Sequence, residues 1–146
     1  MAYFAELNEN NIVINTIVID DNDTQDVNGN SSEIIGIAYC QKNYGANTNW
    51  KQFYRDGRRG NRAGIGVTYV TNVATLGVGS TDIFIGQQLY GSWKISTTEA
   101  DWVPPSTPGD APALTEDELA AGKYYVWNES NYQADPATAW VLTTPE

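Results

Sequence analysis

Residues 12–19 read Ile-Val-Ile-Asn-Thr-Ile-Val-Ile, a run of β-branched side chains without a charge. Such side chains lose rotamer freedom in a helix and pack well on a pleated sheet. The run therefore predicts a strand that is buried on both faces, or nearly so. Residues 2–7 are expected to pair with it, because the intervening residues 8–11 (Asn-Glu-Asn-Asn) are types that tolerate a tight turn.

Two capping patterns predict helices. Asn30 followed by Glu33 has the spacing of a capping box and opens a helix that stops near Gly45. Thr115 followed by Glu118 has the same spacing and opens a short second helix. The first of these helices is expected to lie on the sheet.

The remaining apolar segments predict strands at 50–54, 65–73, 78–84, 90–95, 124–127 and 139–142. We therefore expect a mainly β protein of the α+β class, with an N-terminal β-hairpin and one helix on a small antiparallel sheet, followed by Trp-rich β-hairpins. Its expected parts are a β-rich docking domain (1–103), a Pro-rich connector with a short helix (104–122) and an aromatic hairpin (123–146).

Composition excludes most catalytic chemistry. The 146 residues include no histidine and one cysteine, Cys40, so histidine-dependent triads, imidazole metal sites and intrachain disulfides are excluded. Cys40 is expected in the core, and no cofactor, metal or enzymatic activity is predicted. The acidic loop 20–26 lacks the spacing of a calcium-binding loop, although its oxygens leave calcium binding open. Neither a signal peptide nor a membrane-spanning segment is recognisable.

Charge is unevenly distributed along the chain. The net charge is −10, but residues 1–41 carry −7, residues 42–62 carry +5 and residues 63–146 carry −8. Nucleic acid is disfavoured as a partner by the overall charge. Arginine forks bind carboxylates, so the basic segment predicts a docking site for an acidic neighbour; the alternative is a solvated turn whose arginines pair with the chain's own acids. The candidate residues are Lys51, Arg55, Arg58, Arg59 and Arg62.

Aromatic residues cluster in the C-terminal part. Flat rings stack on sugars, so they predict a glycan or oligomer contact, whereas the alternative is packing within the hairpins. The candidates are Trp93, Trp102, Trp127, Trp140 and Tyr125. A weaker alternative is a carboxylate-only enzyme acting on polysaccharide through Asp82, Glu99 and Asp101.

Several short motifs follow one another along the chain. They include Ala2-x-Phe4-Ala5-x-Leu7, Gly36-Ile37-Ala38-Tyr39-Cys40, Asn49-Trp50-Lys51-Gln52, Asn61-Arg62-x-Gly64-Ile65-Gly66, Tyr90-x-Ser92-Trp93 and Tyr125-x-Trp127-Asn128-Glu129. In these motifs and their order, the chain resembles small proteins encoded by T4-like cyanophages and other marine tailed phages over roughly residues 1–105 and 123–129. Two segments depart from the family pattern: residues 86–89 lack the prolines usual there, and residues 106–122 resemble an insertion.

This resemblance implies a non-enzymatic virion protein, made in the host cytoplasm, that acts as a capsid decoration or tail-associated subunit. Its expected partners are other virion proteins and further copies of itself. The alternative is an adhesion module that binds host surface glycan through the C-terminal aromatic residues.

Overall fold

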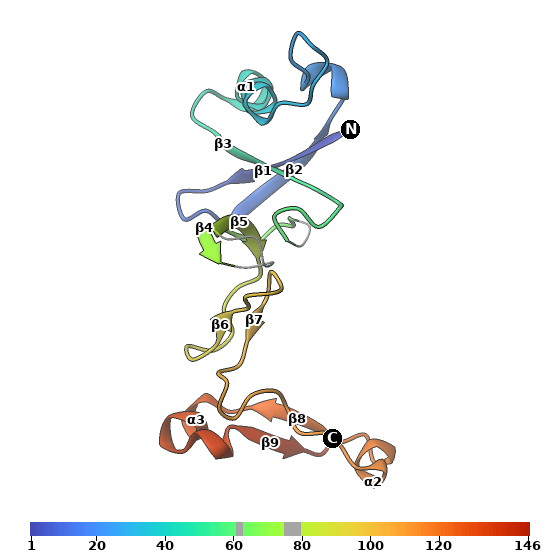
Figure 1. Ribbon diagram of the computed structural model, residues 1–146, viewed down its shortest axis with the longest axis vertical. Coiled ribbons are helices and arrows are strands. Elements are labelled where there is room, and N and C mark those ends of the chain that lie inside the picture. The colour runs from blue at the N-terminus through green and yellow to red at the C-terminus, as the bar shows by residue number, and fades with distance from the viewer. Residues whose placement is uncertain (61–62, 75–79) are drawn as a thin grey trace. The chain divides into compact units, whose positions relative to one another are not determined.

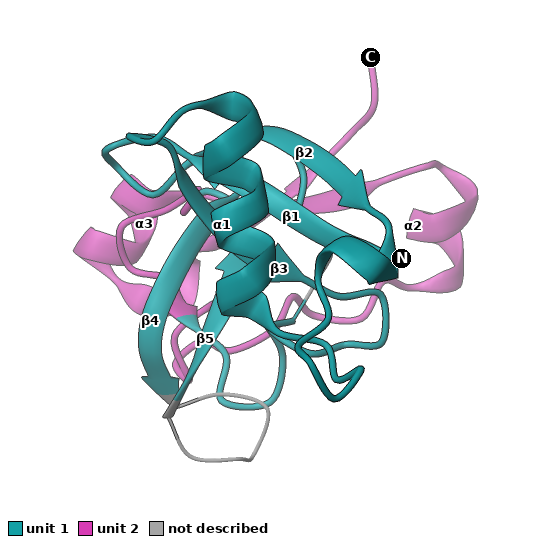
Figure 2. Ribbon diagram, turned by 90° about the horizontal axis from the view of Figure 1, so that it is seen from above, with its two compact units in different colours: residues 1–87, 95–101 teal, residues 88–94, 102–146 magenta. Residues whose placement is uncertain are grey.

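The computed structural model describes residues 1–60, 63–74 and 80–146 and confirms a mixed α+β protein with small antiparallel sheets (Figure 1). The described residues form two compact units that interleave along the chain (Figure 2). Unit 1 comprises residues 1–87 and 95–101, and unit 2 comprises residues 88–94 and 102–146. The three parts expected from the sequence are consecutive, whereas here segment 88–94 belongs with C-terminal residues. No helix in the described ranges is long and apolar enough to span a bilayer.

A three-stranded antiparallel sheet of order β2-β1-β3 forms the centre of unit 1. Its strands are β1 (Ala2–Leu7), β2 (Val13–Ile19) and β3 (Asn49–Phe53). The predicted N-terminal hairpin is confirmed, with Phe4 opposite Ile17 across the β1–β2 ladder. Phe4 is also opposite Gln52 of β3, so β1 is the central strand.

The expectation that residues 12–19 are buried on both faces is wrong. A helix covers one face of the sheet, but the layer on the other face packs on β1, β3 and the first residue of β2, Val13. The rest of β2 therefore has only one covered face, although Ile19 at its end is buried. The exposed side chains of the strand are Ile14, Thr16 and Val18.

Helix α1 (Glu33–Tyr44) begins two residues later than the sequence predicts. Its N-cap is Ser32, whose hydroxyl accepts from the backbone N–H of Ile35, so the prediction of Asn30 as N-cap is wrong. Glu33 is consequently the first helical residue rather than the third, and its carboxylate turns to β3 instead of the cap. The C-terminal end at Gly45 is confirmed.

Helix α1 approaches β1 closely at one glycine. A Cβ atom on Gly36 would lie 2.1 Å from Cζ of Phe4, so the contact has room for glycine alone. Cys40, one turn further along, is fully buried against the same strand face, as predicted. Burial raises the pKa of its thiol to about 11, which makes it unreactive at neutral pH.

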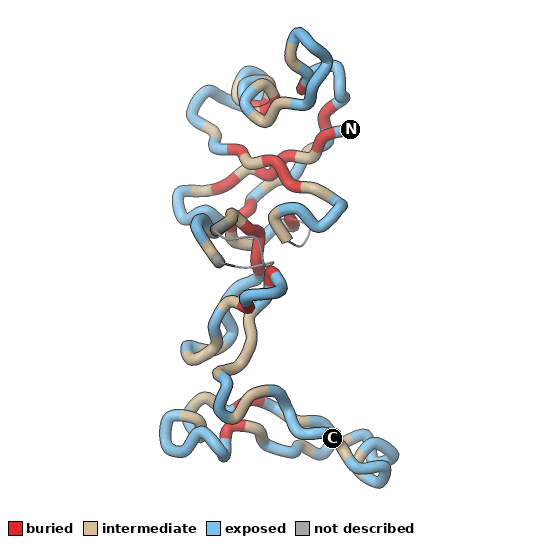
Figure 3. Tube along the Cα trace, viewed as in Figure 1, coloured by how far each residue is buried: buried red, intermediate tan, exposed pale blue. Residues whose placement is uncertain are grey.

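The second layer of unit 1 is a strand pair formed by β4 (Thr68–Ala74) and β5 (Ser80–Ile85). Both were predicted, with ends displaced by a few residues. The ring of Phe84 packs on Tyr69 and Phe53, with centroids 5.1 and 6.2 Å away. This aromatic layer closes the core of unit 1, and Figure 3 shows the buried residues concentrated there.

Unit 2 is smaller and less buried (Figure 3). Its sheet pairs β8 (Tyr124–Trp127) with β9 (Trp140–Thr143), as predicted. Helix α2 (Glu116–Ala120) has the predicted Thr115–Glu118 capping box. The helical segment that joins β8 to β9 was not predicted, and the strand expected at 90–95 is reduced to its last two residues. The further elements of unit 2 are β7 (Trp102–Val103), α3 (Glu129–Ala134) and η2 (Pro136–Thr138). Of β6 (Lys94–Ile95), Lys94 belongs to unit 2 and Ile95 to unit 1, and η1 (Asp21–Asp23) belongs to unit 1.

Candidate functional site

The arginine loop, residues 54–60, follows β3 in unit 1 and is fixed at its C-terminal end. The backbone N–H of Phe84 donates to the carbonyl of Arg59 at 2.9 Å. A Cβ atom on Gly60 would lie 2.1 Å from Cβ of Ala100, so the chain passes too closely there for any side chain. Arg59 itself has a left-handed backbone with φ of 57°. The loop is thus a packed part of unit 1 rather than a free turn.

Arg59 forms an internal ion pair with Glu33 of α1. Its Nη2 lies 3.0 Å from Oε1 and its Nη1 lies 2.5 Å from Oε2, so the pair is bidentate. Both partners also bond the outer edge of β3, because Arg59 donates to the carbonyl of Gln52 and Glu33 accepts from its N–H, each at 2.7 Å. The side chains are only 20% and 25% exposed. Arg59 therefore closes a sheet edge, and both Nη atoms of its fork are engaged within unit 1.

The electrostatics of this pair favour the charged forms. Burial alone raises the pKa of Glu33, but the hydrogen bonds from Arg59 and from the Gln52 backbone lower it further than burial raises it. Burial likewise opposes the charge of Arg59, and the hydrogen bond to Glu33 outweighs it, so the guanidinium pKa is raised. The pair is ionised at neutral pH.

Arg58 is exposed but is held within its own loop. Its Nε lies 2.9 Å from Oδ2 of Asp56, and its guanidinium carbon lies 3.8 Å from the centre of the Tyr54 ring. The backbone N–H of Arg58, and then its side chain, lower the pKa of Asp56. The Arg58 fork keeps donors that face solvent, although its charge is matched locally.

Arg55 differs from both. Its guanidinium carbon lies 4.8 Å above the Tyr3 ring, and the residue is exposed. Within the part of the chain that the structure describes, Arg55 has no salt bridge. Lys51, which is half-buried on β3, lies 5.5 Å from the Tyr69 ring and is not ion-paired either. Arg62 lies outside the described residues.

The exposed part of this loop lines a depression of about 580 Å³ in unit 1. Tyr3, Tyr54, Arg55 and Arg58 line it together with residues of β1, β3 and α1. The acidic lining residues are all paired, with the N-terminal amine, Arg58 or Arg59. Among the charged lining residues, Arg55 is therefore the one without a salt bridge. The depression can offer a planar cationic fork, oriented by an aromatic ring, to an incoming carboxylate.

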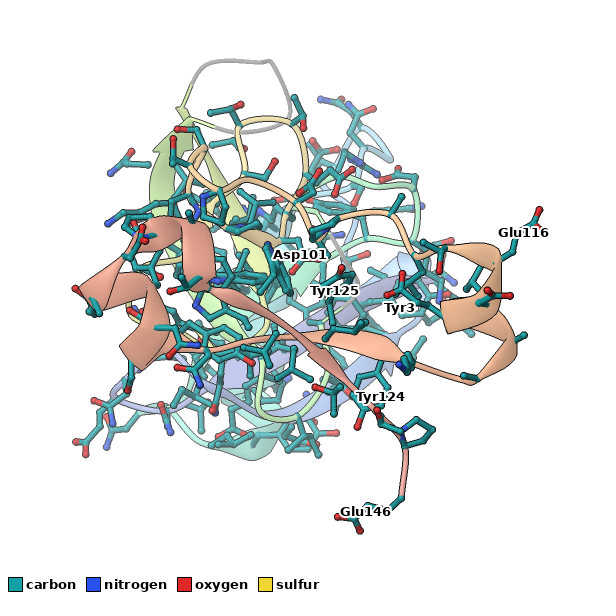
Figure 4. All side chains as sticks on the ribbon, turned by 90° about the horizontal axis from the view of Figure 1, so that it is seen from below. Tyr3, Asp101, Glu116, Tyr124, Tyr125 and Glu146 are labelled. Atoms are coloured by element: carbon teal, nitrogen blue, oxygen red, sulfur yellow. The ribbon has the colours of Figure 1, made fainter. Side chains whose placement is uncertain are left out.

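The aromatic candidates lie mainly inside unit 2. Trp127 is 4% exposed, and Trp93 and Trp140 pack on it edge to face with centroids 5.6 and 5.2 Å away. Tyr125, on the same face as Trp127, and Trp102 of β7 are partly buried. Tyr124 projects from the opposite side of β8 (Figure 4). The structure therefore gives most of these rings a packing role.

One carboxylate organises the aromatic cluster. Oε1 of Glu129 accepts from Nε1 of Trp127 at 3.0 Å and from the hydroxyl of Ser92 at 2.6 Å. Glu129 and Glu33 are the two acids that sequence reasoning missed. In the sequence, Glu33 has the spacing of a capping residue, and Glu129 directly follows an Asn N-cap. Each is therefore explained by a local helix-start pattern, and no sequence pattern indicates its contact with a distant residue.

The remaining carboxylate candidates have local partners. Asp20 and Asp26 accept backbone N–H groups of their own loop, from Asn22 and from Asn28 and Asn30. Asp82 accepts from the hydroxyl of Tyr69, and burial together with this bond raises the pKa of Tyr69. Within the described ranges, no three His, Cys, Asp or Glu residues are grouped to hold a metal ion.

No protein-family model, no curated protein and no solved structure matches this chain. The geometry of the arginine loop and the resemblance in the short motifs are therefore the observations that bear on function.

Proposed function

We propose that the protein is a non-enzymatic accessory subunit of a tailed-phage particle and that it docks through the arginine loop onto an acidic neighbour. The observation that carries the proposal is the state of Arg55. Its guanidinium is exposed at a depression, held over Tyr3 at 4.8 Å, and it has no salt bridge among the described residues. An oriented guanidinium loses little entropy when it binds a carboxylate, which favours docking.

The structure changes which arginines are suited to this role. Arg59 is occupied inside unit 1, whereas Arg58 and Arg55 face the depression. We assign the main contact with the neighbour to Arg55, and an additional contact to the guanidinium N–H groups of Arg58 that face solvent. The phage assignment is supported by the motif resemblance.

Glycan binding by the aromatic residues has weaker support. A sugar-binding platform needs an accessible ring face, but Trp127 is buried and the rings of Trp93 and Trp140 are engaged with it. We therefore retain assembly as the proposed function.

The experiment is a phage that carries Arg55→Glu, with the copy number of the protein in purified particles measured by quantitative mass spectrometry. We expect at least a tenfold loss of incorporation, since a carboxylate would meet the acidic neighbour. Lys94→Glu is the matched control, because it makes the same charge change at another exposed position and should leave incorporation unchanged. Unchanged incorporation of Arg55→Glu would overturn the docking role, and absence of the protein from wild-type particles would overturn the virion assignment.

A further inference from the structure

The two outer edges of the unit 1 sheet are treated differently. On β3, the N–H of Gln52 donates to the Glu33 carboxylate and its carbonyl accepts from Arg59. This ion pair satisfies both backbone groups of Gln52 and fills the place that a further strand would take. The β3 edge is therefore closed at Gln52 by side chains.

Among the residues that the structure describes, the β2 edge is closed at Val13, its first residue. Val13 donates to the carbonyl of Val67 at 2.8 Å and accepts from the N–H of Gly66 at 2.9 Å. Beyond Val13, β2 has no backbone hydrogen bond outside its ladder with β1, within the part of the chain that is described. In Figure 2, β2 forms the outer side of the sheet beside β1.

The ladder register identifies the open backbone groups. Opposed residues of antiparallel strands alternate between pairs that exchange hydrogen bonds and pairs that do not. Because Gln52 directs its groups away from β1, Phe4 opposite it directs its own toward β2 and bonds Ile17. The neighbours of Ile17, which are Thr16 and Val18, then direct their N–H and C=O groups outward.

We propose that β2 pairs antiparallel with β2 of a second copy of this chain, with the two-fold axis at Ile17. In this register, Thr16 of each copy is opposite Val18 of the other, so every outward N–H and C=O of these residues gains a partner. A two-fold interface requires such a self-complementary pattern. The pairing joins the two sheets in the order β3-β1-β2-β2-β1-β3.

Side chains and charge agree with the register. Thr16 and Val18 are exposed and β-branched, a combination that stabilises cross-strand pairs, and Val18 is 56% exposed in the single chain. No residue of β2 is charged, so like charges do not meet at the axis although each copy carries −10. Asp20, just beyond the strand, comes opposite the apolar Ile14 of the second copy. A long, uncharged, apolar edge is the kind that proteins otherwise protect.

The inference does not depend on the docking role of the arginine loop. The loop follows β3, so it lies beyond the strands that end the combined sheet, away from the axis. Docking by the arginine loop and pairing of β2 can therefore fail independently, each in its own experiment.

The first test measures mass in solution by sedimentation equilibrium. We expect wild-type protein to associate to twice its 16.0 kDa mass, and Thr16→Pro to raise the dissociation constant at least tenfold. Proline removes an N–H that points away from β1, so the β1–β2 ladder keeps its bonds. Val18→Lys, which places a like charge beside the axis, is a second variant should the proline disturb folding. Val27→Lys is the matched control, at a fully exposed residue outside the strand.

A wild-type mass of 16.0 kDa at every concentration would overturn the proposal. The proposal would be overturned in the same way if the β2 edge bound a strand of a different protein, because this chain alone would then stay monomeric. A dimer that survives both Thr16→Pro and Val18→Lys would also overturn it, because the interface would lie elsewhere.

The register is tested by oxidative cross-linking. Opposed residues of a pair without hydrogen bonds have Cα atoms about 4.5 Å apart, within the range of a disulfide. Ile17→Cys, at the axis, should therefore cross-link two copies, whereas Ile14→Cys should not. Wild type is the control for the buried Cys40. Equal cross-linking of both variants, or none with Ile17→Cys, would overturn the register.

Discussion

Unit 1 places its buried side chains between layers, whereas unit 2 packs indole rings edge to face around one carboxylate. Unit 1 contains nearly all of the buried apolar residues, from Ala2 at the start of β1 to Ala100. In unit 2, the buried apolar residues among those described are Trp127 and Ala139. The comparison shows that a unit with little buried aliphatic content can still be compact when large rings pack edge to face, here with acceptors for the N–H groups of Trp127 and Trp140, whereas the buried Nε1 of Trp93 has no hydrogen-bond partner among the described residues.

The central carboxylates of the two units differ in the same way. In unit 1, Glu33 is paired with Arg59 and the pair closes a sheet edge. In unit 2, Glu129 has no salt bridge among the described residues and accepts only from neutral donors, which are Ser92, Trp127 and Gln133. Removing a central side chain should therefore affect each unit separately, and each variant below is measured unit by unit.

The largest expected effect is from Trp127→Ala. Truncation of a buried tryptophan costs about 3–5 kcal/mol, and unit 2 has few other buried side chains to compensate. Hydrogen exchange read by mass spectrometry should show loss of protection in β8 and β9 with unit 1 unchanged. Tyr124→Ala, at the 48% exposed neighbour on the opposite face, is the control and should be nearly neutral. Equal loss of protection in both units would contradict the comparison.

The corresponding change in unit 1 is Gly36→Ala. The new Cβ would lie 2.1 Å from Cζ of Phe4, so either the ring or the helix must shift. Overpacking of this kind costs about 1–3 kcal/mol, which urea denaturation followed by α1 and sheet signals will measure. Gly64→Ala is the matched control, because nothing lies within 4 Å of its added Cβ. We expect the control to stay within about 0.5 kcal/mol of wild type.

Glu33→Gln has a smaller expected effect, about 1–2 kcal/mol, because the amide keeps one acceptor for the Gln52 N–H while the charged bond to Arg59 is weakened. The pKa of Glu33 is lower in the folded chain than its ordinary 4.5, so its contribution is present above that value and is lost as pH falls through the folded pKa. The variant should therefore lose stability at neutral pH and less in acid. Glu9→Gln, on an exposed turn, should not change this profile.

Local signals in the sequence predicted most elements of the fold. The β-branched run, the turn residues before it and the Thr115–Glu118 capping box each act within a few residues, and each appears in the structure. Burial of β2 was not predictable, because it depends on how far the β4–β5 layer reaches across the sheet. The Asn30 cap failed because Ser32 stands nearer the helix and competes for the same role.

The candidate site was predictable as a segment but not residue by residue. The clustering of four arginines in eight residues marked the loop. The ion pair between Arg59 and Glu33, which are 26 positions apart, forms because α1 packs on β3, and no sequence signal predicts it. The same holds for Glu129, whose contact with Ser92 joins residues 37 positions apart.

The smallest expected effect is from Glu129→Gln in unit 2. Glutamine keeps an acceptor for Trp127 and Ser92, so this variant removes the charge while the acceptor stays in place. The bonds from Ser92, then Trp127 and Gln133, lower the pKa of Glu129, so its contribution is present above the ordinary value and is lost as pH falls through the folded pKa. Tryptophan fluorescence of wild type should therefore change on acidification through this range, and the variant should show a flatter titration. Glu116→Gln, whose carboxylate points away from the chain on α2 (Figure 4), is the control. If the titration curves of wild type and Glu129→Gln are the same, the charge of Glu129 does not stabilise unit 2. Ring packing alone would then hold unit 2 together, and the two units would differ more than the hydrogen bonds of Glu129 indicate.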